Sequence, residues 1–95
     1  MKKANEITEE KLKKYFEITE KALFQAKKKI NKVRAKEARE ILKMAECYVS
    51  DAHYFEKKLD KVNAFACLNY AHGWLDSGAR LGIFLVKDTK LFTVK

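Results

Sequence analysis

Apolar side chains recur along the first two thirds of the chain at steps of three and four residues, the spacing of one helix face. Thr8 is a candidate N-cap, and the two glutamates after it suit a helix N-terminus. The first stripe consists of Leu12, Phe16, Thr19, Leu23, Ala26, Ile30 and Val33. The second consists of Ala38, Leu42, Ala45, Val49 and Ala52, with Ile41, Tyr48, Phe55 and Leu59 beside it.

The two stripes cannot belong to one straight helix. The five-residue step from Val33 to Ala38 would swing the apolar face by about 140°. We therefore predict a helix over about residues 8–32, a turn near 31–36 and a second helix over about 36–59.

A third helix and a tail complete the predicted fold. Asp60 is an N-cap candidate for a helix over about 61–81, and Gly82 suits its C-terminal end. In the tail, residues 83–95, two β-prone runs around a polar turn predict a hairpin. Similar helix lengths and short connections predict a single domain, residues 1–95. We expect an all-α, antiparallel three-helix bundle with a short C-terminal β-like or extended tail.

Composition narrows the class of protein. The 95 residues include no proline, three glycines and 47% hydrophobic residues, which excludes a disordered chain and a disulfide scaffold. No apolar run is long enough to span a membrane, and no signal peptide follows Met1. Two cysteines without export signals predict reduced thiols in a cytoplasmic protein.

Positive charge is concentrated in the first third of the chain. Residues 1–36 hold 12 basic and 5 acidic side chains, whereas residues 37–95 hold 9 and 8. The densest run has six cations and no acid: Lys27, Lys28, Lys29, Lys32, Arg34 and Lys36. Such a run can bind nucleic-acid phosphates, and Phe24 could stack on a base. The alternative is a solvated helix end on a Lys/Glu-rich, thermophile-like surface.

The third predicted helix is unusual because it is almost uncharged. Residues 62–86 contain two charges, Asp76 and Arg80, whereas the other 70 residues contain 32. A helical wheel places Tyr70, Trp74 and Leu81 with the alanines and leucines of its apolar half. The second half is also poor in charge, so we expect the tail, a second copy or another protein, or a ligand to cover it.

Polar and small residues on this helix form the candidate site. Asn69, His72, Asp76 and Arg80 follow one another at steps of three and four. They could form a structural network, bind a polar or anionic ligand, or let Asp76 orient His72 as a base. Gly73 and Gly78 disfavour the helix, which indicates close approach of another chain segment or a ligand.

No residue set has the types and spacing of a named reaction. The chain lacks CxxC, HExxH, P-loop and GxGxxG motifs, and its two histidines fall on different helices. We therefore expect no cofactor, no metal site and no catalytic residue, and we expect the chain not to be an enzyme.

One segment resembles a known family. The run AFACLNYAHGWLDSGARLGIF, residues 64–84, is similar to the archaeal domain of unknown function (DUF) family 357. Tyr48, Asp51–Ala52 and Tyr54–Phe55 before it, and residues 91–94 after it, also resemble that family. The resemblance implies a small helical protein and assigns no activity.

These observations favour a protein-interaction or assembly module that uses the third helix, with self-association as one form. The predicted surface is Asn69, His72, Gly73, Trp74, Asp76 and Arg80. The alternative is an RNA- or DNA-binding protein that uses the basic run.

Overall fold

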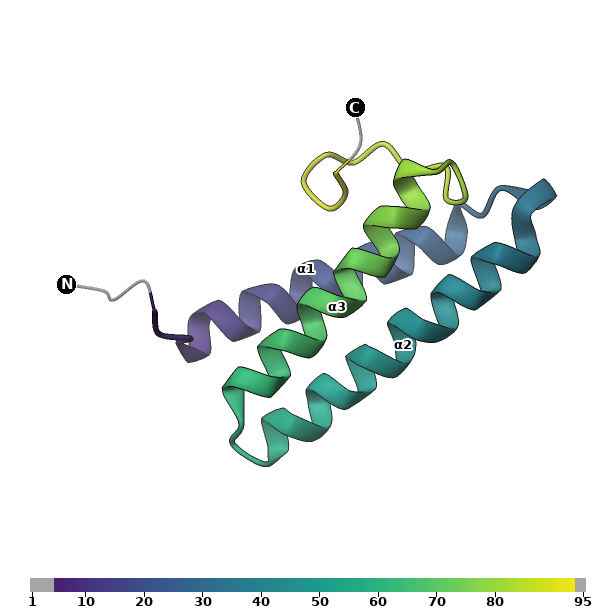
Figure 1. The fold of residues 1–95 in the computed structure, drawn as a ribbon. Coiled ribbons are helices and arrows are strands. Elements are labelled where there is room, and N and C mark those ends of the chain that lie inside the picture. Colours follow the sequence, from purple (N-terminus) through teal and green to yellow (C-terminus); the bar gives the residue numbers. More distant parts are fainter. Residues whose placement is uncertain (1–4, 94–95) are drawn as a thin grey trace.

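The computed structural model describes residues 5–93. The first four residues of the predicted domain and the last two residues of the predicted tail therefore lie outside the described residues. Helix α1 spans Glu9–Lys28, α2 spans Ala35–Lys57 and α3 spans Lys61–Arg80, with the short 3-10 helix η1 at Lys32–Arg34. Residues 5–93 contain no strand. The helices pack into a compact three-helix bundle, and the chain reverses direction between consecutive helices (Figure 1).

Helix α1 begins where the sequence predicts. The Thr8 side chain accepts a hydrogen bond from the Lys11 backbone N–H at 3.1 Å, which caps the helix. Half-buried Ile7 packs in the same apolar cluster as Leu12 and Phe16, one turn and two turns into the helix. The start of α1 is therefore fixed by contacts between residues that are close together in the sequence.

Helix α1 ends at Lys28, four residues before the predicted end. Asn31 breaks the helix because its side-chain oxygen accepts from the Val33 N–H while its amide donates to the Gly82 carbonyl at 3.0 Å. Its own backbone N–H donates to the Ile83 carbonyl at 2.9 Å. Val33 consequently points into solvent with 89% of its surface exposed, so its assignment to the apolar stripe is wrong.

Helix α2 buries the predicted stripe. Its buried residues are Ala38, Ile41, Leu42, Ala45, Val49 and Ala52. The helix ends in a tight turn in which Leu59 adopts a positive φ of 61° and exposes its side chain. Asp60 then caps α3 by accepting from the Asn63 backbone N–H at 3.0 Å.

The C-terminal segment is not the predicted hairpin. Its backbone makes one isolated bridge, between Phe84 and Ile30, and the Leu85 N–H donates to the Lys29 carbonyl at 2.6 Å. Gly82, with a φ of 75°, turns the chain away from α3. Five apolar residues of the two β-prone runs enter the helical core instead of pairing with each other: Ile83, Phe84, Val86, Leu91 and Phe92. Leu85 is exposed.

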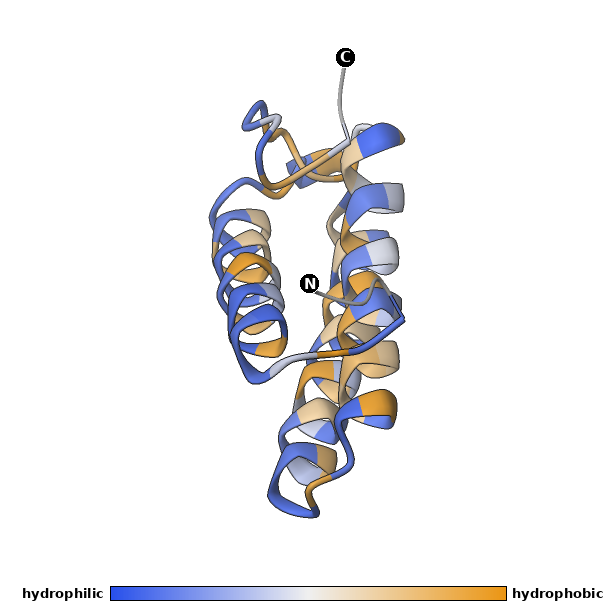
Figure 2. Cartoon of the chain, turned by 90° about the vertical axis from the view of Figure 1, so that its left-hand side faces the viewer, coloured by the Kyte–Doolittle hydropathy of each residue, from blue (hydrophilic) through white to orange (hydrophobic). Residues whose placement is uncertain are grey.

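The tail closes one end of the bundle. Helix α3 contacts α1 and α2, while α1 and α2 make the fewest contacts with each other. Figure 2 shows the tail crossing one end of the bundle, with apolar stretches in orange. Phe84 is almost completely buried there, and a Cβ atom on Gly78 would meet its ring, with Cδ2 2.6 Å away. Gly78 is therefore required by the packing of the tail on α3.

Replacing the two helical glycines by alanine should have opposite effects. Gly78→Ala forces the Phe84 ring to move, and such overpacking costs about 1–3 kcal/mol, more than the helix preference of alanine returns. Gly73→Ala meets nothing within 4 Å and should stabilise the fold by about 1 kcal/mol. Urea unfolding of the dilute proteins measures both. Equal changes of one sign in the two variants would contradict this packing.

The cap of α3 should respond to acid. Hydrogen bonds from Asn63 lower the pKa of Asp60 in the folded chain. The carboxylate therefore stabilises the fold above its unfolded pKa of about 3.9, and this contribution is lost as the pH falls through the lower folded pKa. Asp60→Ala should melt at a lower temperature than the native chain at neutral pH, and the gap should narrow in acid. A gap that stays constant with pH would show that the carboxylate charge contributes nothing.

Candidate interaction surface

The exposed face of α3 is almost free of charge. Of the eleven exposed residues of α1, every one except Phe24 is charged, whereas Arg80 is the only charged residue among the nine exposed on α3. The other eight are Val62, Asn63, Ala66, Asn69, Tyr70, Gly73, Trp74 and Ser77. We call these eight residues the α3 face. Because solvent-exposed helix faces are normally charged or strongly polar, the α3 face is the exceptional surface of the bundle.

A hollow lies in the C-terminal half of the α3 face. It has a volume of about 520 Å³ and is lined by Asn69, Tyr70, Gly73, Trp74 and Ser77. Tyr70 is 63% exposed and stacks on Tyr48 of α2, with the ring centroids 5.0 Å apart. Trp74, at 36%, is partly covered. The hollow is therefore an open notch lined by two aromatic side chains and a glycine.

Gly73 forms the floor of this notch without a structural need inside the chain. Among residues 5–93, no atom apart from those of its chain neighbours and its own helix backbone lies within 4 Å of the position that a Cβ would take. Glycine in a helix interior costs about 1 kcal/mol relative to alanine. Phe84 therefore explains Gly78, whereas no contact among residues 5–93 requires a glycine at position 73.

The polar ladder of α3 does not form one site. His72 and Asp76 turn toward α1 and the tail: Thr19 Oγ1 lies 3.4 Å from His72 Nδ1, and Asp76 Oδ1 lies 3.9 Å from His72 Nε2. Asp76 also accepts from the Thr93 backbone N–H at 2.9 Å and from its hydroxyl at 3.2 Å. Within residues 5–93, no hydrogen bond or ion pair joins Arg80 to Asp76.

The order threonine, histidine, aspartate has the residue types of a catalytic triad, but its burial argues against that role. Thr19 is only 1% exposed, so a substrate could not reach its hydroxyl without opening the core. The contacts of His72 and Asp76 instead join α1, α3 and the tail. The structure thus separates the predicted set: Asn69, Gly73 and Trp74 line the notch, whereas His72 and Asp76 hold helices and tail together.

Sequence reasoning missed two residues of the notch, Tyr70 and Ser77. The helical wheel placed Tyr70 and Leu81 in the apolar half of the helix, but both are exposed. Trp74, which the wheel placed in the same half, was also predicted in the interaction surface, and it is exposed. The buried side chains of α3 are smaller and form a narrower stripe: Ala64, Leu68, Ala71, Leu75, Gly78 and Ala79. The step from Tyr70 to Ser77 across Gly73 was the available signal, because these residues lie on one side of a helix.

The basic run is divided among α1, η1 and α2, and two of its six cations are paired with acids. Lys27 Nζ lies 2.7 Å from Glu46 Oε2. Arg34 donates two hydrogen bonds to Glu37, at 2.9 and 3.0 Å, and a third to the Leu81 carbonyl at 2.6 Å. The hydrogen bonds between them raise the pKa of Arg34 and lower that of Glu37. Arg34 therefore anchors the end of α3 as well as carrying charge.

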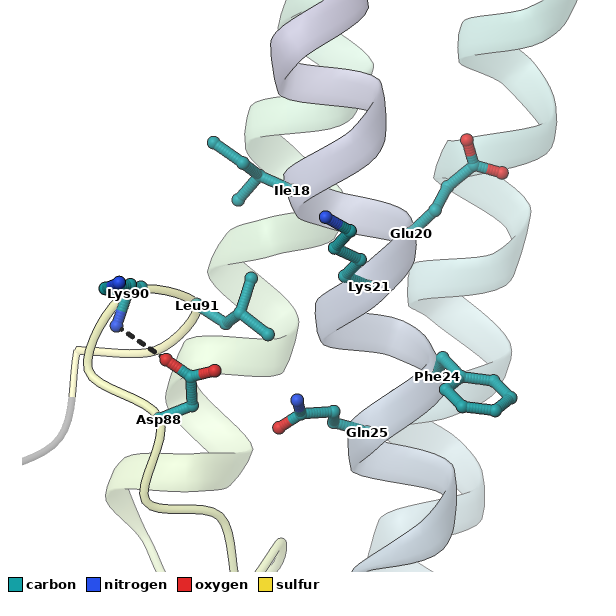
Figure 3. A pocket seen from close by; sticks show the side chains of 8 residues that line it. All are labelled: Ile18, Glu20, Lys21, Phe24, Gln25, Asp88, Lys90 and Leu91. Carbon is teal, nitrogen blue, oxygen red and sulfur yellow. Dashed lines mark hydrogen bonds between the residues drawn. The ribbon is translucent and has the colours of Figure 1, made fainter.

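A second hollow, of about 650 Å³, lies between α1 and the tail (Figure 3). Its charged lining residues are two of each sign: Glu20, Lys21, Asp88 and Lys90. The Asp88 carboxylate is held by the Lys90 backbone N–H at 2.9 Å, and Phe24 points away from the tail. The two positive and two negative charges balance, and the Asp88 carboxylate already accepts a hydrogen bond from within the tail. The lining therefore favours neither anionic nor cationic ligands.

Within the described residues, neither Cys67 nor His53 forms a reactive or metal-binding site. Burial, with a smaller effect of the Asp51 carboxylate, raises the pKa of the Cys67 thiol, which opposes formation of a nucleophilic thiolate. His53 stacks on Phe16 with centroids 4.5 Å apart and lies 3.5 Å from Glu20. Across the described part of the chain, no three His, Cys, Asp or Glu side chains are placed to hold a metal ion.

Comparison with known proteins identifies the family. No helix within residues 5–93 has the length and apolar composition needed to cross a bilayer. No curated protein and no solved structure matches the chain. One family model, described as "Protein of unknown function (DUF357)", matches residues 14–84, from the second turn of α1 to Phe84 of the tail. The resemblance drawn from the sequence is confirmed, and the chain belongs to the DUF357 family.

Proposed function

We propose that this protein is a non-enzymatic interaction module that binds a helix of a protein partner on its α3 face. The observation that carries the proposal is the contrast between eight uncharged exposed residues on α3 and ten charged ones on α1. Burying an unpaired charge costs free energy because the charge loses its hydration, and interface cores are therefore poor in charged residues. A partner that covers the α3 face would bury almost no charge.

The shape of the α3 face suits a helical ligand. A helix that docks on a protein surface inserts apolar side chains at steps of three and four into hollows of that surface. The notch at Gly73 can take such a side chain, and Tyr70 and Trp74 on its flanks are of the types that dominate binding energy. Small side chains at Ala66 and Ser77 leave room for a second helix along α3.

Selection of helical peptides tests this proposal without a known partner. The chain is immobilised sparsely, so that copies cannot meet, and amphipathic helical peptides are selected from a display library. Peptides that bind the native chain should lose at least about tenfold in affinity for Gly73→Lys, because an ammonium group would be buried unpaired. That variant should fold, since nothing lies within 4 Å of the Cβ position.

Ser50→Lys is the matched control, because it adds the same charge at an exposed position of α2. It should leave peptide binding unchanged, and thermal melting should show that both variants are folded. If selected peptides bind Gly73→Lys as tightly as the native chain, the α3 face is not the binding surface.

Nucleic-acid binding is the second candidate, and one observation favours it. Phe24 is 60% exposed on α1, and Lys28 Nζ lies 4.5 Å from its ring centroid, so an aromatic platform and a cation occur together. Against it, Lys27 and Arg34 already hold acidic partners. Lys28, Lys29, Lys32 and Lys36 would have to supply the phosphate contacts.

A salt series on labelled RNA and DNA tests the second candidate. Four phosphate contacts predict a log–log slope of affinity against salt of about −2.8 on single strands and −3.6 on duplex. Replacing the four lysines by glutamate should abolish both slopes, while Gly73→Lys should not. Equal, weak binding by the native chain and the glutamate variant would leave the basic run as a solvated surface.

We propose a cytoplasmic location for this module. The two cysteines are free, and Cys47 is exposed, which suits a compartment that keeps thiols reduced.

A further inference from the structure

Resting on the proposed function, we propose that the helix bound by the α3 face is α3 of a second copy, packed antiparallel about a two-fold axis near Gly73. The two notches then face each other at the middle of the contact. Three features of the chain favour this occupant: where the positive charge lies, on which side of α3 the aromatic residues lie, and how small the exposed residues are.

The charge distribution favours an antiparallel pair. The basic run lies beside the C-terminal end of α3, because Arg34 donates to the Leu81 carbonyl and the Lys29 carbonyl accepts from Leu85. In a parallel pair the two basic ends would meet. In an antiparallel pair with its axis near Gly73, the C-terminal ends of the two α3 helices are about 14 residues or about 21 Å apart, well beyond the screening length of about 8 Å at physiological salt.

The aromatic row is self-complementary in the same orientation. Tyr70 lies on the side of α3 toward α2, where it stacks on Tyr48, and Trp74 follows one turn later on that side. A two-fold axis perpendicular to α3 keeps the α2 side of one copy against the α2 side of the other. The two Trp74 rings therefore come together beside the glycines, flanked by the two Tyr70 rings. A parallel pair would place this row opposite the side that carries His72.

Small side chains let the two helices approach. Ala66, Gly73 and Ser77 are exposed on α3, and small residues at a crossing reduce the distance between helix axes toward 8 Å. Apart from Arg80, the exposed residues of α3 bring no charge of the chain, whose net charge is +8, into the contact. Association should therefore strengthen as salt screens the remaining repulsion between the basic chains, opposite to the salt dependence of nucleic-acid binding.

Sedimentation equilibrium over a range of concentrations tests the pairing. The native chain should pass from 11.1 kDa to twice that mass, and Trp74, the only tryptophan, should shift its fluorescence to shorter wavelength in parallel. Gly73→Lys should weaken association at least about tenfold and remove the fluorescence shift. Ser50→Lys adds the same charge and should change neither.

A cysteine experiment tests the orientation. In a background with Cys47→Ser and Cys67→Ala, one variant carries Ala66→Cys and another Arg80→Cys, seven residues before and after Gly73. Antiparallel pairing predicts that oxidation joins the two variants when they are mixed and joins neither with itself. A disulfide needs Cα atoms within about 7 Å, so the readout is local.

The outcomes separate this inference from the proposed function. If the native chain keeps the mass of one copy at every concentration, the inference that a second copy binds the α3 face is overturned. Peptide selection then still tests whether the α3 face binds a helix of another protein. A dimer that Gly73→Lys leaves intact uses another surface and also overturns the inference. Self-linked Ala66→Cys and Arg80→Cys chains would show a parallel pair and overturn the antiparallel arrangement.

Discussion

Phe84 enters the bundle between α1 and the α2–α3 pair and lies against the bare backbone of Gly78. Helices α1 and α2 touch each other little, so the space between them at this end must be filled by something other than helix. The tail fills it. Asn31 and Arg34 donate hydrogen bonds to the Gly82 and Leu81 carbonyls, and the Asp76 carboxylate accepts one from the Thr93 backbone N–H. The position of α1 and the turn into α2 both depend on this insertion.

The same insertion explains why one face of α3 is left over. The inner stripe of α3 is covered by α1 and α2, and the side that carries His72 and Asp76 is covered by α1 and the tail. Among residues 5–93, no further segment covers the α3 face. Its lack of charge, its notch and its unexplained glycine all lie on this remaining surface, which is why we assign binding to it.

Local signals made much of the fold predictable. The caps at Thr8 and Asp60 and the stripe of α2 depend on neighbouring residues, and each was found by its spacing. The end of α1 was missed because Asn31 is fixed by bonds to a segment fifty residues away. The hairpin was wrong for a related reason: short β-prone runs fit strands, but here the helices bury their apolar side chains.

The sequence predicted which helix carries the candidate site, but not which side of that helix is exposed. Composition identified α3 as the uncharged helix, and this holds. Which side it buries depends on helix packing, and the helical wheel grouped the exposed Tyr70 with the apolar residues of the helix. The sequence does not distinguish Gly73 from Gly78. The structure does, because the Phe84 ring packs against Gly78 and leaves no room for a Cβ there, whereas a Cβ on Gly73 would meet nothing within 4 Å.

Hydroxyl-radical footprinting of the aromatic side chains would test most directly whether a second helix covers the α3 face. Tyr70, Phe24 and Tyr54 are similarly exposed in one chain, at 63%, 60% and 57%. In concentrated solution, compared with dilute solution, our account predicts that Tyr70 and Trp74 become protected while Phe24 and Tyr54 keep their reactivity. Protection of Phe24 or Tyr54 with Tyr70 unchanged would contradict it.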